Sequence, residues 1–140
     1  MKKIESLILS GKESLPIIEG GKGIAVSSGE SSGAWAKAGG VGTFSGVNAD
    51  SYDEEGNLIP QIYKKNTRSG RHKELIDFSV SGAIEQAKIA RDIAGSKAPI
   101  HINILWEMAA AEEILTRTLE KAGNIIDGVT CGAGMPYKLS

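Results

Sequence analysis

Two glycine-rich turns are the parts of this sequence best suited to contact with a ligand. The first, Gly20–Gly23, follows the short apolar run Pro16–Ile18, and the second, Gly132–Gly134, follows the apolar run at 125–131. Glycine has no Cβ, so its backbone adopts positive φ readily and can approach a ligand closely. A single glycine cluster would indicate only a tight connection. The repetition at the end of a second apolar run favours a ligand-binding site.

The apolar run Ile100–Leu105 contains two polar residues, His101 and Asn103, separated by one isoleucine. Residues two apart in a β-strand point to the same face, so both side chains would lie on one side of the strand. Asn103 is nearer the carboxyl end, and its amide can both donate and accept hydrogen bonds, which makes it the better candidate for binding. For His101, a hydrogen-bonded position in the core is the favoured interpretation.

The sequence offers little for thiol or metal chemistry. Cys131 has no histidine near it in sequence, and free cysteines are among the most buried residues, so a small apolar role is favoured over a nucleophile. The other histidine is His72, and two histidines with one cysteine give no metal-ligand spacing. A lone cysteine also excludes an internal disulfide and fits a reducing compartment.

Alternating strand and helix patterns would position these residues. The predicted strands are 16–18, 41–46, 100–105 and 125–131, and the predicted helices are about 28–38, 73–94 and 107–122. Each connection is long enough for parallel strands, so the order defines an α/β fold. Two architectures fit: a small, open, doubly wound sheet and the first half of a (β/α)8 barrel. Ligands bind at the carboxyl ends of the strands in both.

Two segments lie outside this alternation. Residues 1–15 are expected to form a short amphipathic lead-in, because Ile4, Leu7 and Ile8 have helical spacing. Residues 48–70 are expected to form an irregular charged loop, acidic in its first half and basic afterwards. A solvated surface loop is the favoured interpretation, and the alternative is a flap whose basic half binds a phosphate or carboxylate.

Length and charge exclude several classes of function. The 140 residues correspond to a single domain. A net charge of -1 provides no basic field for nucleic acid or an anionic membrane, so neither partner is expected. Glu5 and Ser6 interrupt the short apolar start, and no membrane-spanning stretch follows, so a cytoplasmic protein is expected.

Four motifs together resemble one flavoprotein family. They are PIIEGGKGIAVS, AKAGGVGTFSG, PIHINIL and DGVTCGAGMPYKLS, spread over nearly all of residues 14–140. In this order and spacing, the chain resembles the nitronate monooxygenase family, also described as 2-nitropropane dioxygenase-like. The resemblance implies a (β/α)8, or TIM-type, barrel that binds FMN. It implies that residues 1–140 are a single N-terminal partial-barrel domain with the first four strands.

The resemblance also implies site residues. Gly20, Gly21, Lys22 and Gly23 would lie against the flavin ring, and Asn103 would form a hydrogen bond with a polar edge of it. Cys131 and Gly132 would stand at the end of the next strand. Lys22 replaces an apolar residue, often methionine, and Gly132 stands where the best-studied branch has its catalytic histidine. No residue is therefore assigned a catalytic role.

The implied function is an FMN-dependent oxidoreductase that oxidises alkyl nitronates or a related small organic substrate, incomplete in this chain. The alternative is a non-catalytic half-barrel module, truncated or split, that needs a partner. In that case a second chain or self-association would complete the barrel.

Overall fold

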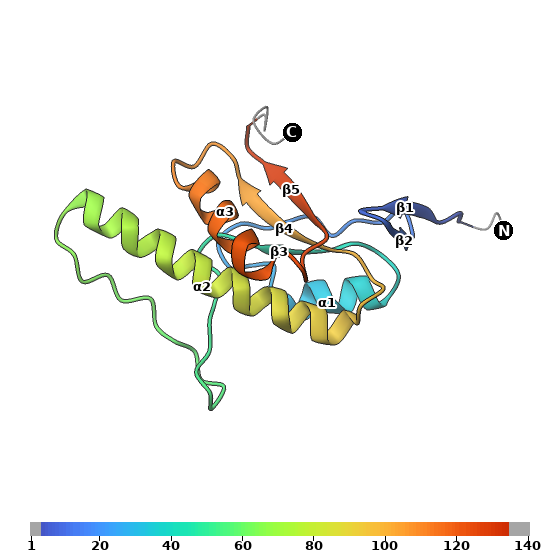
Figure 1. Cartoon of the computed structure of the whole chain (residues 1–140), viewed down its shortest axis with the longest axis horizontal. Coiled ribbons are helices and arrows are strands. Elements are labelled where there is room, and N and C mark those ends of the chain that lie inside the picture. Colours follow the sequence, from blue (N-terminus) through green and yellow to red (C-terminus); the bar gives the residue numbers. More distant parts are fainter. Residues whose placement is uncertain (1–3, 135–140) are drawn as a thin grey trace.

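A computed structural model describes residues 4–134. Its elements, in chain order, are β1 (Leu7–Leu9), β2 (Lys12–Ser14), α1 (Gly29–Lys37), β3 (Gly42–Ser45), α2 (Arg68–Ala94), β4 (Ile100–Leu105), α3 (Ala111–Ala122) and β5 (Gly128–Gly132). Strands β3, β4 and β5 form a parallel sheet in that order, and β1 and β2 form a separate antiparallel hairpin. The predicted α/β class is confirmed (Figure 1).

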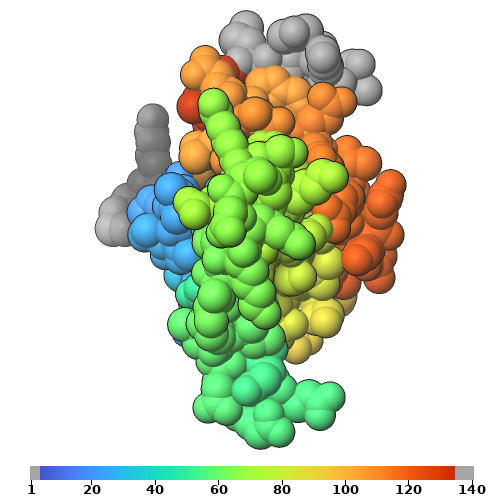
Figure 2. Space-filling model, turned by 90° about the vertical axis from the view of Figure 1, so that its left-hand side faces the viewer, coloured from blue at the N-terminus to red at the C-terminus, as the bar shows by residue number. Residues whose placement is uncertain are grey.

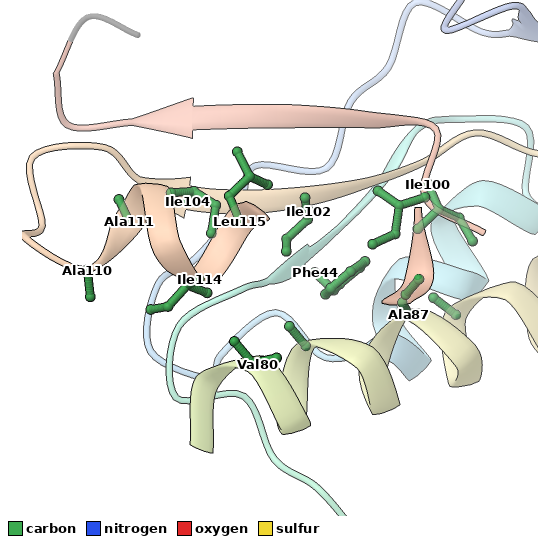
Figure 3. Packing of buried hydrophobic residues seen from close by; sticks show 14 of the residues in the cluster. Phe44, Val80, Ala87, Ile100, Ile102, Ile104, Ala110, Ala111, Ile114 and Leu115 are labelled. Carbon is green, nitrogen blue, oxygen red and sulfur yellow. The ribbon is translucent and has the colours of Figure 1, made fainter. Parts of the chain in front are cut away.

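The helices pack on one face of the sheet and form the core with it. Phe44, Ile102 and Ile104 alternate with polar residues along β3 and β4, and all three are fully buried. They contact apolar side chains of α2 and α3 such as Val80 and Leu115 (Figure 3). Burying each such side chain contributes roughly 1.5–3 kcal/mol, so this face holds the domain together.

The first predicted strand is present only as a single bridge. Ile18 pairs with Val41 in parallel, where Val41 N–H donates to the Ile17 carbonyl and Glu19 N–H to the Val41 carbonyl, each at 2.9 Å. This edge segment therefore precedes β3 in the expected sequential order. Ile18 itself is half exposed at the edge.

The helical lead-in predicted for residues 1–15 is wrong, because the segment forms the β1–β2 hairpin instead. Ser10 and Gly11 both have positive φ, 52° and 73°, which is the backbone of a tight two-residue hairpin turn. Two apolar spacings over five residues were too short a pattern to separate a helix from a strand.

Two predicted boundaries shift for local reasons. Helix α2 begins five residues earlier than expected because the Thr67 hydroxyl caps it, accepting a hydrogen bond from Gly70 N–H at 3.1 Å. Helix α3 begins four residues later, because the N–H groups of Trp106 and Glu107 donate to the carbonyls of Gly132 and Ala133. The sheet pairing thus continues past β4 and delays the helix.

The expected irregular loop runs from the end of β3 to the start of α2 and projects from the body (Figure 1). Its tip is a tight turn: the Asp53 carboxylate accepts the N–H groups of Glu55 and Asn57 at 3.1 and 2.7 Å, and Gly56 has φ 83°. Among residues 4–134, none of the helices combines the length and apolar character needed to span a membrane.

A carboxylate joins four elements at the amino ends of the strands. Asp127, just before β5, accepts Lys12 Nζ at 2.7 Å, Arg91 at 2.6 Å and Ile100 N–H at 2.8 Å. Burial opposes its charged form, but these three hydrogen bonds outweigh burial and hold the pKa of Asp127 below its ordinary value. The hairpin, α2, β4 and β5 are therefore tied together at this point.

Candidate functional site

The sheet face opposite the helices is lined by polar side chains. Strand register places them side by side: Thr43, Ser45, His101, Asn103 and Thr130. We call this set the polar face. Thr43, Ser45, His101 and Asn103 are buried, and Thr43 Oγ1 has no hydrogen-bond partner within residues 4–134. A buried polar surface next to an apolar core is the kind of lining that positions polar groups of a ligand.

Asn103 stands at the carboxyl end of this face, between the two glycine-rich turns. A Cβ built on Gly21 would lie 2.3 Å from Asn103 Cγ, and one built on Gly132 would lie 3.9 Å from Asn103 Oδ1. Only glycine permits the approach at position 21. Residues 82 positions apart in sequence therefore meet where the sequence analysis expected them to meet.

The first glycine turn is held across the strand ends by hydrogen bonds of its backbone to Ser27, which is bonded in turn to β3. Lys22 N–H donates to Ser27 Oγ at 3.0 Å, and Ser45 N–H donates to the Ser27 carbonyl at 2.8 Å. Between them, Ile24 and Ala25 have φ values of 53° and 61°, a left-handed conformation that non-glycine residues seldom adopt. Such strain is found preferentially at functional sites.

Of the two turns, the first borders on open space. A Cβ on Gly20 would meet no atom within 4 Å, whereas a Cβ on Gly132 would make ordinary van der Waals contacts with Leu105 and Asn103 at 3.8 and 3.9 Å. The side-chain amide of Asn103 lies between the two turns and forms no hydrogen bond within residues 4–134, although the residue is only 3% exposed. Open backbone at Gly20 and a side-chain amide without a hydrogen bond fit a planar ring with polar edges.

Glu19 directly precedes the glycine turn and was missed by the sequence analysis. Its carboxylate is buried, accepting Ser31 Oγ–H at 3.0 Å and Thr43 N–H at 2.9 Å. It thereby fixes the start of the turn to α1 and β3. An acidic residue between an apolar run and a glycine turn was the signal that could have revealed it.

Cys131 is a predicted site residue whose side chain is not brought to Asn103. It pairs with Ile104 in the register of β4 and β5, and so shares the face of the apolar core. Burial raises the pKa of the Cys131 thiol, which keeps it protonated. Lys22 is exposed at the surface of the turn, and residues 135–140 of the last motif lie outside the described residues.

His101 occupies the opposite, amino end of the polar face. Its Nε2 lies 2.9 Å from Ser10 Oγ of the hairpin, and its Nδ1 lies 3.3 Å from Thr130 Oγ1. Burial lowers the pKa of His101, and the nearby Asp127 carboxylate offsets this only in part. His101 thus joins the hairpin to the sheet as a neutral imidazole.

This arrangement predicts a pH dependence of stability. Unfolded His101 takes up a proton near its ordinary pKa of about 6.5, whereas folded His101 takes it up only at lower pH. The free energy of unfolding should therefore fall as pH drops through about 6.5 toward the folded pKa. Urea unfolding at about pH 7.5 and about pH 5.5 should show this loss in the wild type and in His72→Gln. The same loss in His101→Gln would contradict the assignment.

Comparisons with known proteins do not identify this site, so its interpretation depends on its geometry. The chain matches no known protein-family model and no curated protein. Within residues 4–134, no three His, Cys, Asp or Glu side chains gather closely enough to hold a metal ion.

Proposed function

We propose that this chain is the flavin-ring half of an FMN-dependent oxidoreductase of the nitronate monooxygenase type. The observation that carries the proposal is the meeting of Gly21 and Gly132 with Asn103 at the carboxyl end of the polar face. Parallel sheets bind ligands at this end. The resemblance of the four strand-end motifs to that flavoprotein family supports the same assignment.

The placement of the helices favours a barrel over a doubly wound sheet. Helices α1, α2 and α3 all lie on one side of the sheet (Figure 1), and α1 packs closely on α2 through Gly29 and Gly33. A doubly wound fold carries helices on both faces, whereas a barrel keeps them outside and turns its other face inward. We infer that the polar face is the inner face of a partial barrel.

Each site residue then has a definite task. Gly20, Gly21 and Gly23 let the backbone approach the ring, and the Asn103 amide forms a hydrogen bond with its polar edge. When bound, FMN would supply the electron transfer between an organic substrate and dioxygen. Gly132 has no side chain to remove a proton, so the substrate that suits this site arrives already deprotonated, as an alkyl nitronate does.

Two substitutions test the ring site through FMN affinity, measured by the change in flavin fluorescence on titration. Asn103→Ala should weaken binding about three- to tenfold, the effect of one lost hydrogen bond. Gly20→Ala should weaken it roughly tenfold, because the new methyl group fills space that the ring would use. A Cβ at Gly20 touches nothing within 4 Å, so the thermal midpoint should not change.

The matched control is Asn124→Ala, at the exposed end of α3. It removes the same side chain far from the strand ends and should leave FMN affinity at the wild-type value. Equal affinity for the wild type, Asn103→Ala and Gly20→Ala would remove the basis for the ring site.

A second candidate function is a non-catalytic half-barrel module that associates with a second chain or with itself. The observation in its favour is the apolar edge beside β3, where Ile17, Ile18 and Trp35 are 41%, 53% and 42% exposed. Exposed apolar side chains on an incompletely paired sheet edge favour association. Saturable flavin binding that depends on Asn103 supports the enzyme, and its absence in every variant supports the module.

A further inference from the structure

A hollow that shares no residue with the proposed ring site lies at the start of α2. Figure 2 looks onto this end of the molecule, where the loop meets the helix. The hollow measures about 400 Å³ and is lined by Tyr63, Arg68, Arg71, His72 and Leu75. We call it the α2 pocket. Its size lies at the lower end of the range of small-molecule sites.

The α2 pocket is strongly basic in a chain of nearly zero net charge. Residues 63–75 contain five lysines and arginines and a single acid, Glu74. The Glu74 carboxylate is already used, because it accepts the backbone N–H groups of Lys64 and Lys65 at 3.0 and 3.2 Å. Positive side chains in residues 63–75 therefore outnumber negative ones by four.

The arginines of the pocket differ from the other two arginines of the chain. Arg91 pairs with Asp127 at 2.6 Å, and Arg117 pairs with Asp77 at 2.8 Å. Among residues 4–134, neither Arg68 nor Arg71 forms an ion pair, and Arg71 donates only its Nε–H, to the Lys65 carbonyl at 3.0 Å. Their terminal N–H groups remain free to bind an anion in the forked geometry that suits phosphate.

The remaining wall of the pocket is aromatic and fixed in place. The Tyr63 ring packs edge-on against Phe78, with centroids 5.4 Å apart and planes at 81°. Its hydroxyl lies 3.4 Å from Asn48 Nδ2, in the segment that follows β3, and Leu75 completes the apolar part. A flat apolar group could stack against this wall while its anion reaches the arginines.

We propose that the α2 pocket binds a small phosphomonoester that carries an aromatic ring. Arg68 and Arg71 hold the phosphate, and Tyr63 and Leu75 contact the ring. The site is separate from the polar face and goes beyond the flavin function. The proposal assigns phosphate binding to the basic half of the loop, which was the alternative to a solvated surface loop in the sequence analysis.

Isothermal titration of the full chain at fixed ionic strength tests this site, with phenyl phosphate as the probe. Phenyl phosphate should bind saturably at one site per chain and at least tenfold more tightly than inorganic phosphate, phenol or benzoate. Equal affinity for phenyl phosphate and inorganic phosphate would mean an adventitious anion site only and would overturn the proposal.

Two double variants separate the pocket from general charge. Arg68→Gln with Arg71→Gln should weaken phenyl phosphate binding tenfold or more, whereas Lys37→Gln with Lys121→Gln removes the same charge elsewhere and should weaken it less than twofold. Circular dichroism confirms that each variant is folded. Unchanged binding in the arginine variant, or equal losses in both variants, would overturn the proposal.

Discussion

Asp127→Ala is expected to lower the free energy of unfolding by about 2–4 kcal/mol. Removing one partner of a buried ion pair leaves the other charge uncompensated, which costs about 3–5 kcal/mol when burial is complete. The Asp127 side chain is 14% exposed, so the expected loss lies somewhat below that range. The loss also releases Lys12, Arg91 and the Ile100 N–H together, and so frees the hairpin from the sheet. Denaturant unfolding measures the effect.

The matched control for this prediction is Asp77→Ala. Asp77 pairs with Arg117 at 2.8 Å, but its side chain is 63% exposed, so the substitution should cost less than about 1 kcal/mol. An equal decrease in the free energy of unfolding in the two variants would show that the buried hydrogen bonds and ion pairs of Asp127 do not stabilise the fold more than an exposed ion pair does.

The Asp127 carboxylate also makes the free energy of unfolding decrease at acid pH. The folded pKa of Asp127 is depressed, so its stabilisation is present above the unfolded pKa, about 3.9, and is lost as pH falls through the folded value. Asp127→Asn should therefore show a shallower loss of stability than the wild type below about pH 4.

Gly82→Ala is expected to destabilise the fold by about 2–3 kcal/mol, although alanine is the better helix former. A Cβ on Gly82 would lie 1.7 Å from the carbonyl oxygen of Ala49, so α2 and the loop after β3 would have to separate. Such overpacking against backbone exceeds the roughly 1 kcal/mol that alanine gains in helix propensity.

The neighbouring substitution Ser81→Ala serves as its control, because Ser81 is exposed on the same turn of α2. It should raise stability by a few tenths of a kcal/mol. The difference in thermal midpoint between the two variants gives the result. A rise in the midpoint for Gly82→Ala would show that helix propensity dominates and that the close contact with Ala49 is unimportant.

The α/β alternation could be predicted because its longer elements have strong patterns. Strand β4 has the predicted bounds, since its isoleucines alternate with His101 and Asn103. Short elements could not be predicted in the same way. The hairpin depends on the positive φ of Ser10 and Gly11, which no apolar spacing encodes.

The glycines show a similar limit. Glycine is typical of turns, and Gly11 and Gly56 do occupy turns with positive φ. Gly42 and Gly82 instead allow close packing, where a Cβ would lie 1.9 Å from the Ser32 carbonyl oxygen and 1.7 Å from that of Ala49. Both contacts join different elements of the fold, so they become visible only in the folded chain.

The candidate site was predictable in part for a physical reason. Carboxyl ends of parallel strands meet at one edge, so the turns around Gly21 and Gly132 could be expected to converge on Asn103. The face to which Cys131 points depends on the register of β5, and the burial of Glu19 depends on its contacts with α1 and β3. Neither the register of β5 nor the contacts of Glu19 can be predicted from the pattern of residue types within one segment.

The most direct test of the ring site is to follow backbone and side-chain amide signals by nuclear magnetic resonance while lumiflavin is added. Lumiflavin has the flavin ring without the phosphate, so binding at the α2 pocket does not interfere. We expect saturable shifts of the backbone amide signals of Gly20, Gly21, Gly23 and Gly132 and of the Asn103 side-chain amide signal. The signals of Arg68 and Arg71 should not shift. Saturating lumiflavin without shifts at these residues would contradict it.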